Sequence, residues 1–269
     1  MDNDDHQIGK ILTRREALAM LGVGGLAFLA ACGRLPQTLP ASLEPSPTAA
    51  ASPSSGISTP TASLMPPTSL PACVVRPAQS EGPYFVDEML DRSDIRSDPS
   101  NGIVKEGVPL ELTFRLSQIG AGACTPLPGA MVDVWHCDAL GVYSDVSDSR
   151  SNTVGQKFLR GYQVTNETGL ASFTTIYPGW YQGRTVHIHF KIRGDSAPGT
   201  GYEFTSQLYF DDLVSDQVFT NQPYAGKGER SVRNDGDPIF RNGGDQLTLV
   251  LTSSGEGYIA TFDIGVQLG

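Results

Sequence analysis

Residues 109–118 read PLELTFRLSQ, a stretch in which apolar and polar side chains alternate. Successive side chains of a β-strand point to opposite faces, so this alternation predicts a strand with one buried face. The face expected to be buried carries four residues: Leu110, Leu112, Phe114 and Leu116.

Further stretches show similar alternation, and Gly, Pro, Asn and Asp cluster between them. They are residues 130–136, 170–176, 185–193, 204–210, 246–252 and 257–264. Long helical periodicity is missing from the sequence, and residues 85–96 are the best candidate for a short helix. Many short strands separated by turns predict an all-β fold, an antiparallel β-sandwich with short helical and long loop insertions.

The first 32 residues have the features of an export signal. Arg14 and Arg15 precede an apolar run, residues 17–31, which is too short to span a membrane comfortably but suits the apolar region of a signal. The arginine pair resembles a twin-arginine signal, and residues 29–32, LAAC, resemble a lipoprotein cleavage site. We therefore expect an exported, membrane-anchored protein lipidated at Cys32; the alternative is a plain secretory signal with an incidental cysteine.

Residues 33–70 contain 8 Pro, 8 Ser and 5 Thr. Such a composition buries too little apolar surface to offset the entropy of ordering, so this region is predicted to be a disordered tether. Residues 71–269 then form one domain, with Cys73, Cys124 and Cys137 as its cysteines and the disulfide pairing open. The net charge of −10 over the whole chain disfavours a nucleic-acid partner.

Residues 185–193, TVHIHFKIR, carry the clearest chemical signal. The period of a strand places His187 and His189 on one face and the apolar residues between them on the other. Two adjacent imidazoles form half of a metal site, although paired histidines can also be structural. Tyr181 lies in the preceding turn, and its phenolate would be a hard anionic donor that favours a trivalent metal. Taken without the histidine pair, Tyr181 is better explained as a half-buried tyrosine at a strand end.

Several runs along the chain, in order, resemble the intradiol ring-cleavage dioxygenases, in particular an exported single-domain branch of that family. The shorter ones are residues 79–85 (QSEGPYF), 158–161 (FLRG), 177–181 (YPGWY) and 206–210 (SQLYF). The more extensive ones are residues 133–144 (DVWHCDALGVYS) and 184–190 (RTVHIHF). The resemblance extends over about residues 77–212. The family that it points to includes the catechol and protocatechuate dioxygenases.

The resemblance implies a non-haem Fe(III) site and a set of roles. The ferric ligands would be Tyr143, Tyr181, His187 and His189. Arg184 and Gln207 would act with Tyr181 in catalysis, and Tyr84 would contact the substrate, whereas His136 would be structural. The implied reaction uses O2 to open a catechol-type ring between its two hydroxylated carbons and yields a muconate-type diacid. The identity of the catechol and the oligomeric state stay open.

Other functional classes fit less well. A cupin would need a Glu shortly after the histidine pair, and residues 190–195 contain none. A serine hydrolase would need a GxSxG motif, which the chain lacks. A non-catalytic, transthyretin-like lipoprotein that binds aromatic or cell-wall-derived ligands would keep the strand pattern without needing both tyrosines and both histidines. Residues 211–212 and 234–237 are rich in Asp and are interpreted as solvated turns, with calcium binding as the alternative.

Overall fold

The computed structural model describes residues 74–268 except 121–122, 149–150 and 198–199. The predicted signal, the lipidation site Cys32 and the tether at 33–70 lie outside the described residues. Among the described residues, no helix is long and apolar enough to cross a membrane.

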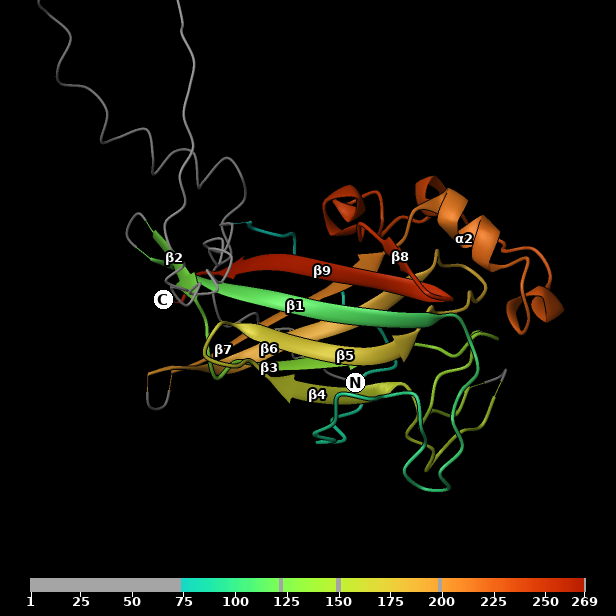
Figure 1. The fold of residues 1–269 in the computed structure, drawn as a ribbon, viewed down its shortest axis with the longest axis horizontal. Helices are drawn as coiled ribbons and strands as arrows, with labels where there is room; N and C mark the ends of the chain where they lie inside the picture. The colour runs from blue at the N-terminus through green and yellow to red at the C-terminus, as the bar shows by residue number, and fades with distance from the viewer. Residues whose placement is uncertain (1–73, 121–122, 149–150, 198–199, 269) are drawn as a thin grey trace, which may run out of the picture.

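Two β-sheets packed face to face form the body of the described chain (Figure 1). One sheet contains β1 (Pro109–Gly120), β2 (Ala123–Pro126), β5 (Leu170–Ile176), β8 (Thr252–Ser254) and β9 (Gly257–Val266). The other has the order β4-β3-β6-β7, with β3 (Met131–Trp135), β4 (Arg160–Val164), β6 (His187–Ala197) and β7 (Thr200–Tyr209). The predicted β-sandwich is confirmed.

The core lies between the two sheets and follows the predicted alternation. The four apolar side chains of β1 are fully buried. Phe114 is central among them, since its ring lies 5.2 Å from that of Phe190 in the opposite sheet and about 6 Å from Phe173 and Phe262 in its own. Burial of these rings is the main force that holds the sheets together.

One strand pair departs from the antiparallel prediction. β1 pairs with β9 in parallel, whereas every other ladder between named strands of the described chain is antiparallel. Alternation of side chains has the same period in both orientations, so the sequence pattern does not distinguish them.

Two local predictions were wrong. Residues 85–96 do not form a helix but run extended along the sheet edges, with bridges from Asp91 to Tyr162 in β4 and from Asp94 to Thr174 in β5. This segment thus covers an edge strand of each sheet, which competes with local helix formation. Residues 246–252 contain the end of the 3-10 helix η3 (Gly244–Leu247) and the start of β8 rather than one strand.

The remaining helices follow β7, in a region that the sequence pattern had not marked as helical (Figure 1). They are α2 (Asp212–Val218), η1 (Tyr224–Lys227) and η2 (Asn234–Gly236). Asp211 begins α2, because its carboxylate accepts hydrogen bonds from the N–H groups of Leu213 and Val214. The expected solvated turn at 211–212 is therefore a helix start.

Of the cysteines in the described chain, Cys124 is disulfide-bonded and Cys137 is a buried free thiol. The sequence left the disulfide pairing open, and the partner of Cys124 lies outside the described residues.

Candidate metal centre

The first residues of β6 carry the histidine pair on the outer face of their sheet. Ile188 and Phe190 point into the core as predicted, and His187 and His189 point the other way, yet both are about 2% exposed or less. Loops therefore cover this end of the sheet. Trp135 in β3 pairs with His189 in register, and the two rings stack 5.0 Å apart at an angle of 7°.

Two of the covering loops deliver Tyr143 and Tyr181, and two glycines let these loops touch. A Cβ on Gly141 would lie 2.1 Å from the carbonyl oxygen of Trp180, and φ at Gly141 is +80°, a conformation that favours glycine. A Cβ on Gly179 would lie 2.3 Å from the carbonyl oxygen of Ala139. The close approach of the two backbones brings the tyrosines to the same histidine.

The four predicted ligands converge. Nε2 of His187 lies 3.1 Å from Nε2 of His189, 3.2 Å from the hydroxyl of Tyr181 and 3.5 Å from that of Tyr143. Two ligand atoms about 2.1 Å from one cation and at right angles to each other lie about 3 Å apart. The spacing of these donors therefore suits a single metal ion.

The protonation of the histidines also suits a metal. Nδ1 of His187 lies 2.7 Å from the carbonyl oxygen of Thr185, which can only accept a hydrogen bond. The ring proton therefore resides on Nδ1, and the lone pair of Nε2 faces the other candidate ligand atoms. Burial lowers the pKa of His187 to about 3, with a further contribution from the charge of Arg184. Burial also lowers the pKa of His189. Both imidazoles are thus neutral and able to coordinate at neutral pH.

The tyrosine hydroxyls are held in their neutral form by burial, which raises the pKa of Tyr143 and of Tyr181. The positive charge of Arg184 opposes this effect at both residues. A cation bound to both oxygens would oppose it far more strongly, as metals deprotonate their ligands. Two phenolates and two neutral imidazoles carry a charge of −2. A trivalent cation bound to them keeps one positive charge with which to bind an anion, whereas a divalent cation would be fully neutralised.

Arg184 lies beside the four rings and is fixed at two points. Its Nε donates to Asp237 at 2.8 Å, and its Nη2 donates to the side-chain oxygen of Gln207 at 2.6 Å. Gln207 is opposite His189 in the register of β6 and β7, and its amide nitrogen donates to the backbone of Ser80 at 2.7 Å.

Asp237 was missed by the sequence reasoning, which treated residues 234–237 as a solvated turn. Its carboxylate is fully buried and accepts from the backbone N–H of Thr185 at 2.9 Å as well as from Arg184. Its position next to Arg184 depends on the fold of the chain after β7, so no local pattern could have revealed it.

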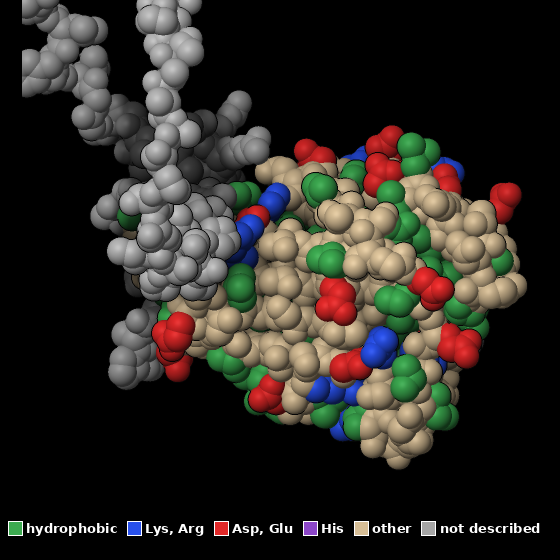
Figure 2. All heavy atoms as spheres, viewed as in Figure 1, with side chains coloured by type: hydrophobic (Ala, Val, Ile, Leu, Met, Phe, Trp, Pro, Cys, Tyr) green, Lys and Arg blue, Asp and Glu red, His purple; other side chains and the backbone are tan. Residues whose placement is uncertain are grey.

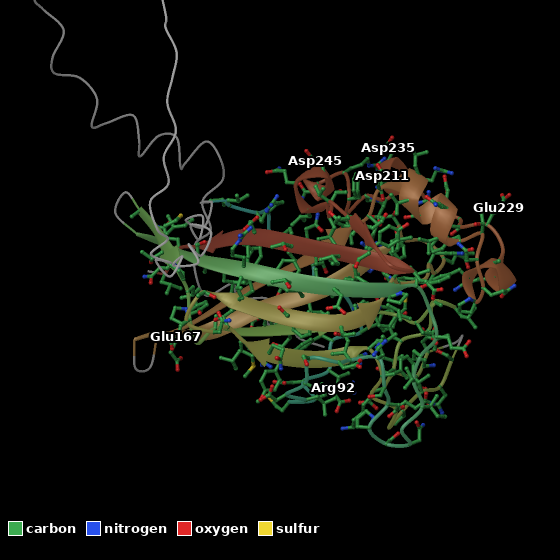
Figure 3. The ribbon with its side chains drawn as sticks, viewed as in Figure 1. Arg92, Glu167, Asp211, Glu229, Asp235 and Asp245 are labelled. Atoms are coloured by element: carbon green, nitrogen blue, oxygen red, sulfur yellow. The ribbon has the colours of Figure 1, made fainter. Side chains whose placement is uncertain are left out.

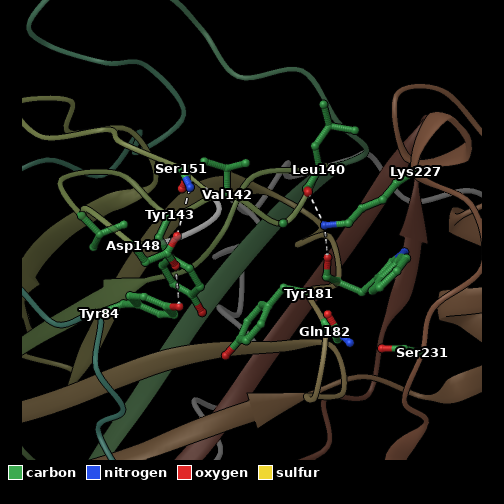
Figure 4. Close-up of a pocket in the computed structure, with 13 residues that line it drawn as sticks. Tyr84, Leu140, Val142, Tyr143, Asp148, Ser151, Tyr181, Gln182, Lys227 and Ser231 are labelled. Atoms are coloured by element: carbon green, nitrogen blue, oxygen red, sulfur yellow. Dashed lines mark hydrogen bonds between the residues drawn. The ribbon is translucent and has the colours of Figure 1, made fainter.

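A cavity of about 540 Å³ opens beside the tyrosines (Figure 4). Tyr84, Tyr143 and Tyr181 contribute to its wall, and Figure 4 shows the three phenol groups from separate segments around the same space. The ring of Tyr84 stacks on that of Tyr143 at 4.4 Å, and its hydroxyl donates to Asp148 at 3.0 Å. Lys227 lines the cavity too, but its ammonium donates to the backbone carbonyls of Trp180 and Leu140.

The third histidine of the domain has a structural environment. His136 is fully buried, with Nε2 2.7 Å from the hydroxyl of Thr175 and Nδ1 2.8 Å from the backbone oxygen of Cys137. The structure thus brings together all seven predicted catalytic, substrate-contacting and ligand residues, and leaves His136 bonded elsewhere. No histidine appears on the molecular face drawn in Figure 2, in agreement with the burial of all three described histidines.

A family model described as Dioxygenase matches residues 80–227. Among solved structures, the intradiol ring-cleavage dioxygenase from Tetranychus urticae is 30% identical, with a TM-score of 0.62, over 72% of this chain and 95% of that one. The dioxygenase domain of a carbohydrate-binding fusion protein from Streptomyces sp. SirexAA-E is 31% identical, with a TM-score of 0.51, over 73% of this chain and 100% of that one.

A curated relative, the chlorocatechol 1,2-dioxygenase of Pseudomonas putida, is 32% identical over a stretch that covers 32% of this chain and 36% of that protein. The matched part therefore spans only about a third of this curated relative, whereas it spans nearly all of the two solved chains.

Proposed function

The chain belongs to the intradiol ring-cleavage dioxygenase family, and on this basis we propose that it is a non-haem Fe(III) enzyme that opens catechol-type rings. In the proposed reaction O2 attacks a bound catechol, the bond between the two hydroxylated carbons breaks, and both oxygen atoms enter a muconate-type diacid. The observation that carries the proposal is the convergence of two phenol and two imidazole groups beside a cavity.

The iron would be held by Tyr143, Tyr181, His187 and His189. When bound, Fe(III) supplies Lewis acidity that withdraws electron density from a coordinated catecholate. Tyr181 is the less buried of the two tyrosines and lines the cavity. Once ionised by the bound metal, its oxygen would therefore be the more accessible base for a proton from a substrate hydroxyl.

Arg184 supports the proposal through electrostatics. Asp237 and Gln207 hold its guanidinium in one orientation, and the carboxylate of Asp237 keeps the surrounding charge balanced. A cation fixed in advance can stabilise negative charge that develops on the ring without reorganising, which is the condition for a large electrostatic effect on rate.

We propose a neutral catechol as the substrate class. The cavity wall is largely aromatic and aliphatic, and its lysine is occupied by backbone carbonyls, which leaves little attraction for a carboxylate on the ring. Tyr84 stacks on Tyr143 and faces the same space, so it is proposed to contact the ring of the substrate.

Export and anchoring are proposed from the sequence of residues 1–32. A Cys32→Ser variant expressed in a bacterial host with both export and lipoprotein pathways would lose the lipid and leave the membrane fraction. Mass spectrometry of the N-terminal peptide checks this directly, and an unmodified Cys32 in a processed wild-type protein would contradict the anchor.

The visible absorption spectrum of the iron-loaded protein tests the proposed site. Tyrosinate bound to Fe(III) gives a charge-transfer band, and anaerobic addition of catechol should shift it. The Tyr143→Phe and Tyr181→Phe variants should each weaken the band and lower ring cleavage by at least about 100-fold, since each removes a proposed ligand. Tyr162→Phe, in β4, is the matched control.

A protein that stays colourless after ferric reconstitution would overturn the ligand assignment. Full ring cleavage by both tyrosine variants would do the same. Binding of aromatic ligands without O2 consumption would instead favour the non-catalytic lipoprotein.

A further inference from the structure

A second, much smaller cavity of about 10 Å³ lies behind the metal centre, between β3, β4 and residues 85–90. Three of the residues that line it have a buried polar atom with no hydrogen-bond partner in the protein: Oε1 of Glu88, Nε1 of Trp135 and Nη1 of Arg160. Trp135 and Arg160 are each only 2% exposed. Two donors and one acceptor are thus left unsatisfied on residues that line the same space.

None of the three side chains can easily turn away. The other oxygen of Glu88 pairs with Lys157. The other nitrogens of Arg160 are used as well: Nε donates to the hydroxyl of Ser144 at 2.8 Å and Nη2 to its carbonyl oxygen at 2.6 Å. The indole of Trp135 contacts two rings, since it stacks on His189 and packs against Phe85 at 4.8 Å. The unsatisfied atoms are therefore built into the fold.

Leaving such atoms buried and unpaired is destabilising, because each has given up its hydrogen bonds to water without gaining another. A cation does not fit, because two of the three atoms are N–H donors. An anion is opposed by the carboxylate of Glu88 and by the size of the cavity, which holds about one water-sized sphere. A single water molecule can accept two hydrogen bonds and donate one here, which matches the three bonds that buried waters typically make.

We propose that one buried water binds in this cavity, accepts from Trp135 and Arg160, and donates to Glu88. The water would join residues 85–90 to β3 and β4. It would thereby hold two contacts of the candidate centre in place. One is the stacking of Trp135 on His189, and the other is the hydrogen bond from Arg160 to Ser144, the residue after Tyr143. Its role is one of positioning, and it stands independently of the substrate proposed above.

A crystal structure of the wild-type protein at about 1.5 Å resolution tests the site. We expect one ordered water within hydrogen-bond distance, about 2.7–3.2 Å, of all three atoms. An empty cavity, or side chains that satisfy one another directly, would overturn the proposal.

A double-mutant cycle in urea gives an independent test. Trp135→Phe keeps the ring stack but removes the N–H donor. Glu88→Gln keeps the size of the side chain but replaces the charged carboxylate that is the proposed acceptor. If both groups share one water, the double variant should lose less stability than the sum of the two single losses. Trp180→Phe combined with Glu88→Gln is the matched control and should be additive, because Trp180 lies at the larger cavity. Additive losses for the Trp135 pair would argue against a shared water.

Discussion

Arg184 shows how much of this site depends on the orientation of one side chain. Its planar guanidinium donates to Asp237 and Gln207 at once, a fork that the single ammonium of lysine does not reproduce. We expect Arg184→Lys to lower kcat about 10- to 100-fold, because the charge is kept but its position is lost. Steady-state kinetics with catechol, with iron content measured in parallel, check this.

Iron content should stay near that of the wild type in the Arg184→Lys protein, since Arg184 is not a proposed ligand. A variant that loses its iron together with its activity would mean that Arg184 acts by maintaining the site rather than by stabilising charge.

His136 makes the stability of the protein depend on pH. Burial lowers the pKa of His136 from 6.5 to about 4. Below pH 6.5 the unfolded chain binds a proton that the folded protein does not, so the free energy of unfolding should fall between pH 6.5 and about 4. The shift corresponds to about 3 kcal/mol of stability, lost in full only below pH 4.

Urea unfolding of the metal-free protein at several pH values measures this loss. His136→Gln cannot titrate and should show a smaller slope over the same range, whatever its stability at neutral pH. Equal slopes for the two proteins would exclude His136 as the source.

At the scale of elements, the contact between the two sheets depends on the middle of β1. Phe114 touches aromatic rings of both sheets, whereas Thr113 faces the opposite side and bonds to Ser172. We expect Phe114→Ala to lower the free energy of unfolding by about 3–5 kcal/mol through the cavity it leaves. Thr113→Ala, the neighbouring control, should cost less than about 1 kcal/mol. Urea unfolding measures both, and similar losses would contradict the assigned faces.

The candidate site combines side chains placed by a strand of the sandwich with side chains placed by the loops that cover it. The histidines are placed by the register of a strand, and the tyrosines by loops whose glycines permit close contact. A rigid strand and two loops held together by backbone approach can therefore place the other three donor atoms 3.1–3.5 Å from Nε2 of His187.

At the scale of the whole molecule, charge is the dominant property. The chain carries a net charge of −10, and Asp211, Asp235 and Asp245 are labelled on the helical region after β7 (Figure 3). Such a field repels anions at long range, and salt screens that repulsion. We expect kcat/KM for a carboxylated catechol to rise about two- to fivefold between 10 and 200 mM salt.

Catechol itself is neutral and should show little change over the same series. A carboxylated substrate whose kcat/KM falls with salt would indicate local attraction at the cavity, by Lys227 for example, that outweighs the field of the whole protein.

The sequence was sufficient to predict the sandwich, the buried face of β1 and the seven residues gathered at the centre. Strand alternation records which side chains are buried, and the two histidines on one face of a strand can likewise be read locally. Tyr84, Tyr143, Arg184 and Gln207 were expected only from the family resemblance. Properties that need distant segments to meet were out of reach. The parallel pairing of β1 with β9, the extended edge segment at 85–96 and the burial of Asp237 against Arg184 all depend on the folded chain. Their physical reason is shared: each is stabilised by contacts with residues far away in the sequence, which no local pattern records.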